Sequence, residues 1–262
     1  INNGALDIGN GDIWGYLATG GGSYDIGNNG SVMGLDTPAG VSEDPDRIAY
    51  DFKAELPDVD IPSLTVNYTT LAAGTIGDSN AAWSDDPVVY HISSLSMSGS
   101  NHINVVGPTV IIVDGGFSMS GQAELNITGT NAYLEMYVGG DLDLTGQGVM
   151  NQFQNPEAFQ VWGTAPAGSS QSIKVAGNGD FAGIVYAPNA DVDVNGNGNV
   201  SGAIVGDNIT LVGNAAFHYD VNLKNKEDGG TMAIGRWREL RGASERLNFS
   251  STSGLASAIS PL

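Results

Sequence analysis

Short sequence segments recur along this chain at nearly constant spacing, and this repetition limits the folds that it can adopt. The segment Gly177–Gly183 (GNGDFAG) returns as Gly196–Gly202 (GNGNVSG), 19 residues later. Near the beginning, Asn10–Gly15 (NGDIWG) returns as Asn29–Gly34 (NGSVMG) at the same offset. A repeat of about 20 residues is typical of a solenoid, in which each repeat forms one coil and buries its apolar face against its neighbours.

A longer repeat lies in the middle of the chain, where Val113–Gln122 and Val138–Gln147 match at an offset of 25 residues. An offset that stretches from 19 to 25 suits coils whose loops vary in length. Within the repeats, apolar and polar residues alternate, which predicts short strands with one buried face. The alternating apolar residues are Phe117, Met119, Leu142, Leu144, Val192, Val194, Ile209 and Leu211.

The repeats and their alternation together predict an all-β chain folded as a right-handed parallel β-helix. A β-sandwich or a β-barrel is the alternative, but these folds are built from antiparallel hairpins and need no fixed repeat. The strands are followed by Gly or Asn-Gly, which can adopt the left-handed backbone of a sharp corner. We expect Asn178, Asn197 and Asn214 either to stack as a side-chain ladder or simply to tolerate that backbone at the corners.

The pattern divides the chain into four parts. Residues 1–35 are expected to form N-terminal β-helix coils, and residues 88–222 the main β-helix. Residues 36–87 hold five of the ten prolines and several acidic clusters, which predicts an irregular excursion packed on the solenoid. Residues 223–262 differ from the coils and are expected to form a C-terminal cap or an assembly tail.

The charge of the chain narrows the choice of partners. There are 29 acidic and 9 basic residues, a formal net charge of −20, and no cysteine. Nucleic acids are bound through Lys and Arg, so we expect no nucleic-acid partner. The absence of cysteine excludes disulfides and thiolate metal sites. The negative charge fits either uptake of divalent cations or a solvated surface that keeps the protein soluble.

No stretch of the sequence is long and apolar enough to span a membrane as a helix. The chain opens as Ile1-Asn2-Asn3-Gly4, without an initiator methionine or a leader. We therefore expect any membrane anchor to lie upstream of this segment.

No catalytic, cofactor-binding or metal site is predicted, and the chain is expected not to be an enzyme. Polysaccharide lyases need a basic residue to remove a proton, yet Lys174 is the only Lys or Arg between residues 54 and 223. The pairs Asp141/Asp143 and Asp191/Asp193 could serve an inverting hydrolase, but we interpret them as the polar outer face of alternating strands.

Several other polar and aromatic residues are weaker candidates for a site. His91, His102 and His218 lack metal-ligand spacing, and two acidic groups could bind Ca²⁺ but match no known calcium loop. These groups are Asp78-Ser79-Asn80 with Asp85-Asp86, and Glu43, Asp44 and Asp46. The tryptophans could bind sugars, although large aromatics in a β-helix usually lie in the core or a cap; they are Trp14, Trp83 and Trp162.

The order of several segments resembles PilX-like, pilus-assembly-associated secreted β-helix proteins of bacteria. The similarity covers about residues 88–240 and, more loosely, 1–60. The segments that carry it are Thr109–Gly121, Gly183–Ala190, Gly202–Gly206, Phe217–Leu223 and Trp237–Leu240. The resemblance implies a surface-exposed β-helical domain, usually carried behind a hydrophobic pilin-type helix that this sequence does not contain, and it brings no catalytic motif.

We therefore expect an extracellular or cell-surface structural module of a bacterial filament, pilus-associated component or adhesin. It would act by self-assembly, as a homo-oligomer or filament, or by surface display. The alternative is a carbohydrate-binding or polysaccharide-processing β-helix protein with a surface polysaccharide as its partner.

The C-terminal tail provides a test of self-assembly, because residues 236–246 carry four of the nine basic residues, on an otherwise acidic chain. If this tail joins subunits by charge attraction, deletion of residues 231–262 should leave soluble, folded monomers. If the tail only caps its own coil, deletion should lower the melting temperature or cause aggregation, with no polymer seen beforehand. Light scattering and thermal unfolding distinguish the two outcomes.

Overall fold

The computed structural model describes most of residues 6–219 in a unit that comprises residues 1–220. The described residues are 6–7, 9–51, 56–145, 147–177, 181–196, 199–213, 217–219 and 223. Asn178, Asn197 and Asn214, where an asparagine ladder was expected, lie outside these residues, and so does nearly all of the predicted tail at 223–262. The structure therefore tests the coils and the excursion.

The chain is all-β, with short 3₁₀ helices as its only helical elements among the described residues. The helices are η1 (Pro45–Arg47) and η2 (Pro156–Ala158). The strands are β1 (Leu6–Asp7), β2 (Asp12–Trp14), β3 (Leu17–Ala18), β4 (Tyr24–Asp25), β5 (Ser31–Met33), β6 (Ile48–Ala49), β7 (Gly74–Ile76), β8 (Val88–Ile92), β9 (Leu95–Met97), β10 (His102–Val105), β11 (Pro108–Val113), β12 (Phe117–Met119), β13 (Glu124–Ile127), β14 (Tyr133–Val138), β15 (Leu142–Leu144), β16 (Gly148–Asn151), β17 (Phe159–Gly163), β18 (Gln171–Gly177), β19 (Phe181–Gly196), β20 (Val200–Gly213) and β21 (Phe217–Tyr219).

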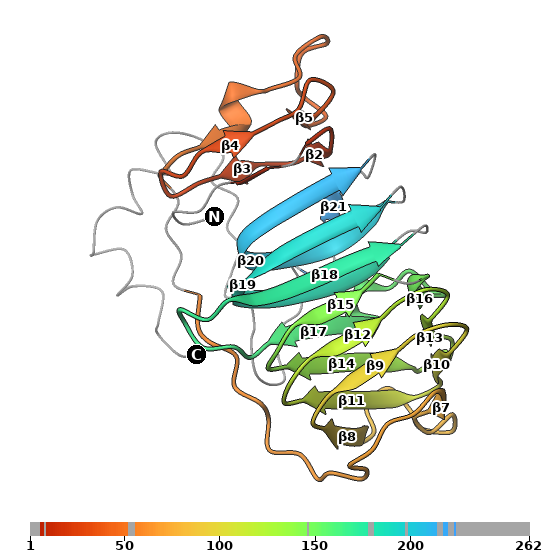
Figure 1. Ribbon diagram of the computed structural model, residues 1–262. Coiled ribbons are helices and arrows are strands. Elements are labelled where there is room, and N and C mark those ends of the chain that lie inside the picture. Colours follow the sequence, from red (N-terminus) through yellow and green to blue (C-terminus); the bar gives the residue numbers. More distant parts are fainter. Residues whose placement is uncertain are drawn as a thin grey trace, which may run out of the picture. The chain divides into compact units, whose positions relative to one another are not determined.

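The strands pair in parallel and form a β-solenoid of about eight turns, so the predicted fold class is confirmed (Figure 1). Sheet 1 runs in the order β8-β11-β14-β17-β19-β20-β21-β2-β5. Sheet 2 contains β9, β12, β15 and β18, the later halves of β19 and β20, and then β1 and β4. Sheet 3 contains β7, β10, β13 and β16.

The observed register confirms both repeat lengths. Phe117 pairs with Leu142 at an offset of 25, and Phe181 pairs with Val200 at an offset of 19. The longer coils contain a sheet 3 strand, whereas only three residues separate β19 from β20. The difference between the two repeats is therefore the presence or absence of the third side of the coil.

The repeated glycine at the end of the 19-residue motif has a steric cause. Gly202 has a φ of +137°, and a Cβ atom there would lie 1.9 Å from the carbonyl oxygen of Gly183 in the coil below. Only glycine tolerates both this backbone and this approach. The repeat in the sequence thus marks a point where successive coils come unusually close.

The core consists of ladders of apolar side chains that point into the solenoid from successive coils. One ladder in sheet 2 contains Phe117, Leu142, Ile173 and Val192, which follow one another in register and are fully buried. The predicted core residues Met119, Leu144 and Val194 form a parallel ladder beside it. On the outside, Asn126 Nδ2 donates to Asn104 Oδ1 at 3.2 Å across sheet 3.

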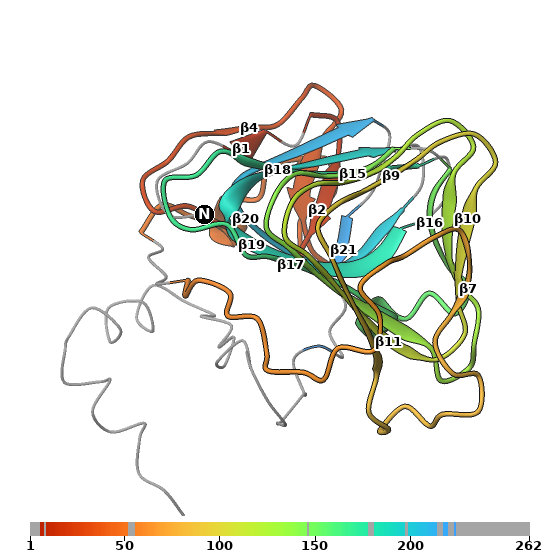
Figure 2. The same ribbon diagram turned by 60° about the horizontal axis from the view of Figure 1, so that its bottom comes forward.

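The order of the coils in space differs from their order in the sequence. Strand β1 lies between β20 and β4, and β2 lies between β21 and β5, so the first coils stack on the last coil of the main solenoid. The chain then runs along the outside of the solenoid as a connector, residues 50–73, and enters the opposite end at β7 (Figures 1 and 2). Our expectation that the first coil begins the stack with an unpaired edge is wrong.

Segments of the region 36–87 contact the strand edge at each end of sheet 1. At one end Val32 of β5 bridges to Glu43, and β6 pairs with β3. At the other end Tyr68 bridges to Tyr90 of β8, and the Val89 carbonyl accepts from the backbone N–H of Asn67 at 2.9 Å. This region is mostly irregular but also contains η1, β6 and β7.

Truncation of one core ladder should destabilise the whole stack. Leu142 is fully buried, and Leu142→Ala should lower the free energy of unfolding by about 3 kcal/mol because it removes apolar contacts and leaves a cavity. Met150 is 54% exposed, and Met150→Ala should change it by less than about 0.5 kcal/mol. Urea unfolding followed by far-ultraviolet circular dichroism measures both values. Equal losses for the two variants would contradict this assignment of inward and outward faces.

Candidate functional site

The four aspartates considered for hydrolysis lie on one patch of the outer face of sheet 2. Asp143 of β15, Lys174 of β18 and Asp193 of β19 are in register on three successive coils. In the neighbouring row, Asp141 Oδ1 accepts from the backbone N–H of Ser172 at 2.9 Å. Asp191 Oδ1 accepts from Asn208 Nδ2 at 2.6 Å. We refer to these four aspartates with Lys174 as the aspartate–lysine array.

The array has the spacing of a hydrolase pair but not its environment. Two rungs of a sheet separate Asp143 from Asp193, or about 10 Å between backbones, close to the separation of two carboxylates in inverting glycosidases. A general acid that works near neutral pH depends on a site poor in water. Asp141, Lys174 and Asp191 are exposed instead. The arrangement suits a polar outer ladder in which Lys174 separates like charges.

Two histidines form pairs with acids in the next coil. His91 Nε2 lies 2.8 Å from Asp114 Oδ1, and His102 Nδ1 lies 3.3 Å from Glu124 Oε2. His218 is exposed on β21. Among the residues that the structure describes, no three His, Asp or Glu side chains lie close enough together to hold a metal ion.

The first predicted calcium-binding group consists of turn-forming residues. Asp78 Oδ1 accepts from the backbone N–H of Asn80 at 2.9 Å, and Asp85 Oδ2 accepts from that of Ala82 at 2.7 Å. These bonds satisfy backbone donors in the loop between β7 and β8, as Asp side chains commonly do in turns. The carboxylates therefore have a structural use that needs no ion.

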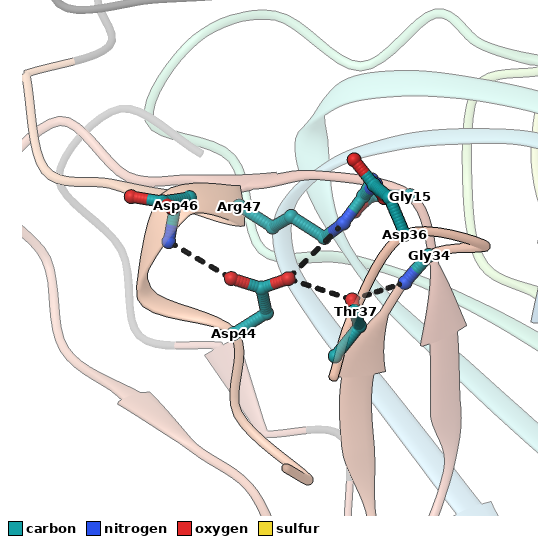
Figure 3. Close-up of polar contacts among 7 residues, drawn as sticks. All are labelled: Gly15, Gly34, Asp36, Thr37, Asp44, Asp46 and Arg47. Atoms are coloured by element: carbon teal, nitrogen blue, oxygen red, sulfur yellow. Dashed lines mark hydrogen bonds and ion pairs between the residues drawn. The ribbon is translucent and has the colours of Figure 1, made fainter. Parts of the chain in front are cut away.

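The second predicted calcium-binding group surrounds Arg47 (Figure 3). Asp44 is buried, caps η1 by accepting from the backbone N–H of Asp46 at 3.1 Å, and lies 3.5 Å from Arg47 Nε. Thr37 Oγ1 donates to Asp44 Oδ2 at 2.6 Å, and Arg47 also pairs with Asp36. The guanidinium takes the place that a cation would occupy beside these carboxylates.

Arg47 ties several turns of the N-terminal coils together. Its Nη1 donates to the carbonyl oxygen of Gly15 at 3.2 Å, and its guanidinium carbon lies 4.7 Å from the ring centre of Tyr16. The hydrogen bond from Arg47 lowers the pKa of the Asp36 carboxyl below its ordinary value. We call Asp36, Thr37, Asp44 and Arg47 the arginine lock.

An apolar column runs along the outer face of sheet 1. Tyr137, Trp162 and Tyr186 are in register on three successive coils. The rings of Tyr137 and Trp162 are stacked, with centres 6.3 Å apart and planes at 16°. Trp162 and Tyr186 have centres 5.8 Å apart. We call these three residues the aromatic column.

The connector covers the aromatic column. Val59 and Leu64 pack against the outward apolar residues of sheet 1, which include Val89, Val110, Ile112 and Tyr137. Tyr186 Oη donates to the carbonyl oxygen of Pro57 at 2.9 Å, and Asn189 Nδ2 donates to Asp58 Oδ1 at 2.7 Å.

This cover has two consequences for the aromatic column. Burial, and then the nearby Asp58, raise the pKa of Tyr186. The column is therefore not presented to solvent as a sugar-binding aromatic surface would be.

The other predicted sugar-binding tryptophans have different environments. Trp83 is half-buried and contacts Tyr133, with ring centres 5.0 Å apart, so it packs against the core from the loop between β7 and β8. Trp14 on β2 is 50% exposed. Trp14 is thus the one tryptophan of the three predicted candidates with a largely accessible ring.

The fold and these surfaces define a parallel β-solenoid whose described side chains form polar outer ladders rather than a concentrated catalytic centre. The chain belongs to a family described as a domain of unknown function (DUF7305), which matches residues 61–226. No curated protein and no solved structure matches the chain. In the described part of the chain, no helix is long and apolar enough to cross a membrane.

Sequence reasoning missed the aromatic column and the arginine lock. The column was visible in principle, because Tyr137, Trp162 and Tyr186 follow one another at offsets of 25 and 24 residues, close to one coil. The lock had no such signal, since Arg47 meets Asp36 and Gly15 only after the chain has turned through the N-terminal coils.

The arginine lock should be sensitive to its buried carboxylate. Asp44→Asn removes the charge beside Arg47 and should destabilise the N-terminal coils by about 2 kcal/mol, a typical cost for a hydrogen-bonded charged group. Asp46 is exposed and contributes only its backbone N–H to Asp44, so Asp46→Asn should have almost no effect. Hydrogen exchange of residues 9–49, followed by mass spectrometry, measures the local change. Similar protection in both variants would contradict the role of Asp44.

Proposed function

We propose that this chain is a non-catalytic structural module displayed at a bacterial cell surface, as part of a pilus-associated component or an adhesin. The observation that carries the proposal is that the chain covers its own apolar outer column and contacts its own strand edges at both ends of sheet 1. A module of this kind presents side chains on regular polar faces and needs no partner to complete its core.

This closure favours display over assembly through bare strand edges. An unpaired edge strand offers N–H and C=O groups to another chain and promotes polymerisation. Here β20 is paired with β1, and β8 is bridged by Tyr68. The net charge of −20 also keeps identical copies apart at low ionic strength.

The absence of catalysis rests on the exposure of the aspartate–lysine array. Lys174 is the only described lysine in sheet 2, and it lies between two aspartates on an exposed face. Such a lysine is held protonated by its neighbours and makes a poor base.

A second candidate function is carbohydrate binding at the N-terminal coils. Trp14, Tyr16 and Tyr50 are each about half exposed there. Exposed aromatic rings provide flat apolar surfaces with polar edges, which suit stacking against a sugar.

Display and catalysis can be tested separately. Antibodies raised against residues 61–226 should label intact cells of the source bacterium as strongly as permeabilised cells. Labelling that requires permeabilisation would contradict surface display.

The purified protein should not cleave polygalacturonate, alginate or similar polymers, because its carboxylates lie on an exposed face. Release of reducing ends or unsaturated products is the measurement. Turnover that is lost in both Asp141→Ala and Asp191→Ala would overturn the proposal, whereas binding lost in Trp14→Ala would favour the second candidate. Trp83→Ala is a control for the general effect of losing a tryptophan.

A further inference from the structure

The last coil of the main solenoid ends in an edge that the N-terminal coils occupy. Leu6 and Asp7 of β1 pair with Ile209 and Thr210 of β20, and Ile13 of β2 pairs with a residue of β21. Without β1 and β2, the outer edges of β20 and β21 would offer unpaired backbone groups to any parallel strand. The edge is thus a strand-addition site that is filled in cis.

The N-terminal coils have an apolar core of their own. Leu17, Val32 and Ile48 are buried together, with Leu6, Ile13, Tyr24 and Ile26 packed around them. Among the described residues this cluster is separate from the main core, which reaches Ile204 and Ile209. The arginine lock and the hydrogen bond from the backbone N–H of Asn29 to Asn10 Oδ1 hold these coils together internally.

The pairing between the two parts is short. The described pairing of β1 and β2 with the last coil comprises three residue pairs, whereas β19 and β20 share thirteen. Free energies of local opening follow the amount of pairing and burial that is lost. The contact between the N-terminal coils and the last coil is therefore the place where this unit should open first.

The connector is anchored independently of this contact. Pro57 and Asp58 are hydrogen-bonded to Tyr186 and Asn189 of β19, one coil away from β20. Val59 and Leu64 hold the following residues against sheet 1. The N-terminal coils can thus leave their place while the connector stays on the solenoid.

We propose that the β20–β21 edge is a self-recognition site, and that its partner is the N-terminal coils of a second copy of this chain. The edge requires two short parallel strands with apolar residues in register with β20 and β21, and Leu6 and Ile13 of any copy meet this requirement. Mutual exchange satisfies the same pairs as the monomer and produces a closed dimer.

The family match supports this division of the chain. It begins at residue 61, so the N-terminal coils lie outside the region that defines the family. The inference goes beyond surface display and does not depend on it.

Cysteine pairs in register test the exchange, because the chain contains no cysteine of its own. Asp7 and Thr210 are register partners on adjacent strands, a separation that a disulfide can span. The single variants Asp7→Cys and Thr210→Cys, one carrying a mass tag, are mixed at high concentration, warmed below the melting temperature and oxidised. We expect a mixed disulfide dimer on a non-reducing gel.

Ser118→Cys and Asp143→Cys provide the matched control, since they are register partners on β12 and β15 inside the main solenoid. Their mixture should give no dimer above the level of each variant alone. The double variant Asp7→Cys with Thr210→Cys should form an intramolecular disulfide at low concentration.

Mixed dimer no higher than in the control would overturn the proposal, and so would failure of the double variant to close. Either result leaves surface display intact, because labelling of intact cells does not depend on exchange.

Discussion

Parallel pairing between successive coils is the constraint on which the rest of this structure depends. Each coil has too little apolar surface to be stable alone, so inward side chains such as Phe117, Leu142 and Ile173 must stack in register. The same register aligns everything on the outside. It builds the aromatic column, the aspartate–lysine array and the Asn104–Asn126 contact from residues that are about one repeat apart.

A solenoid built in this way has two ends, and this chain uses its own segments at both. The N-terminal coils occupy the edge of the last coil, while the connector returns the chain to the opposite end and covers the outer apolar column on its way. Closure makes the unit self-sufficient, which supports a display role. It also concentrates the weakest pairing at one contact, and this contact is where a second copy can substitute for the first.

The sequence predicted much of the site's composition and little of its arrangement. It correctly assigned Asp141, Asp143, Asp191 and Asp193 to outer faces, because alternation fixes which side of a strand each residue takes. It did not predict that Lys174 lies between Asp143 and Asp193, because that depends on the length of the loops that join the coils. The calcium hypothesis for Asp44 did not anticipate Arg47, whose guanidinium fills the space between the carboxylates.

The sequence by itself determined the parallel β-solenoid, the inward residues and the coil lengths of 19 and 25 residues, since periodicity and corner glycines are local properties. Only the tertiary structure decided the order in which the coils stack. Each coil offers equivalent strand edges and apolar ladders to either neighbour, so the local pattern does not state which coil lies next to which. The connector settles this order, because its Val59, Leu64 and Asp58 bind the outside of the solenoid and carry the chain from one end to the other.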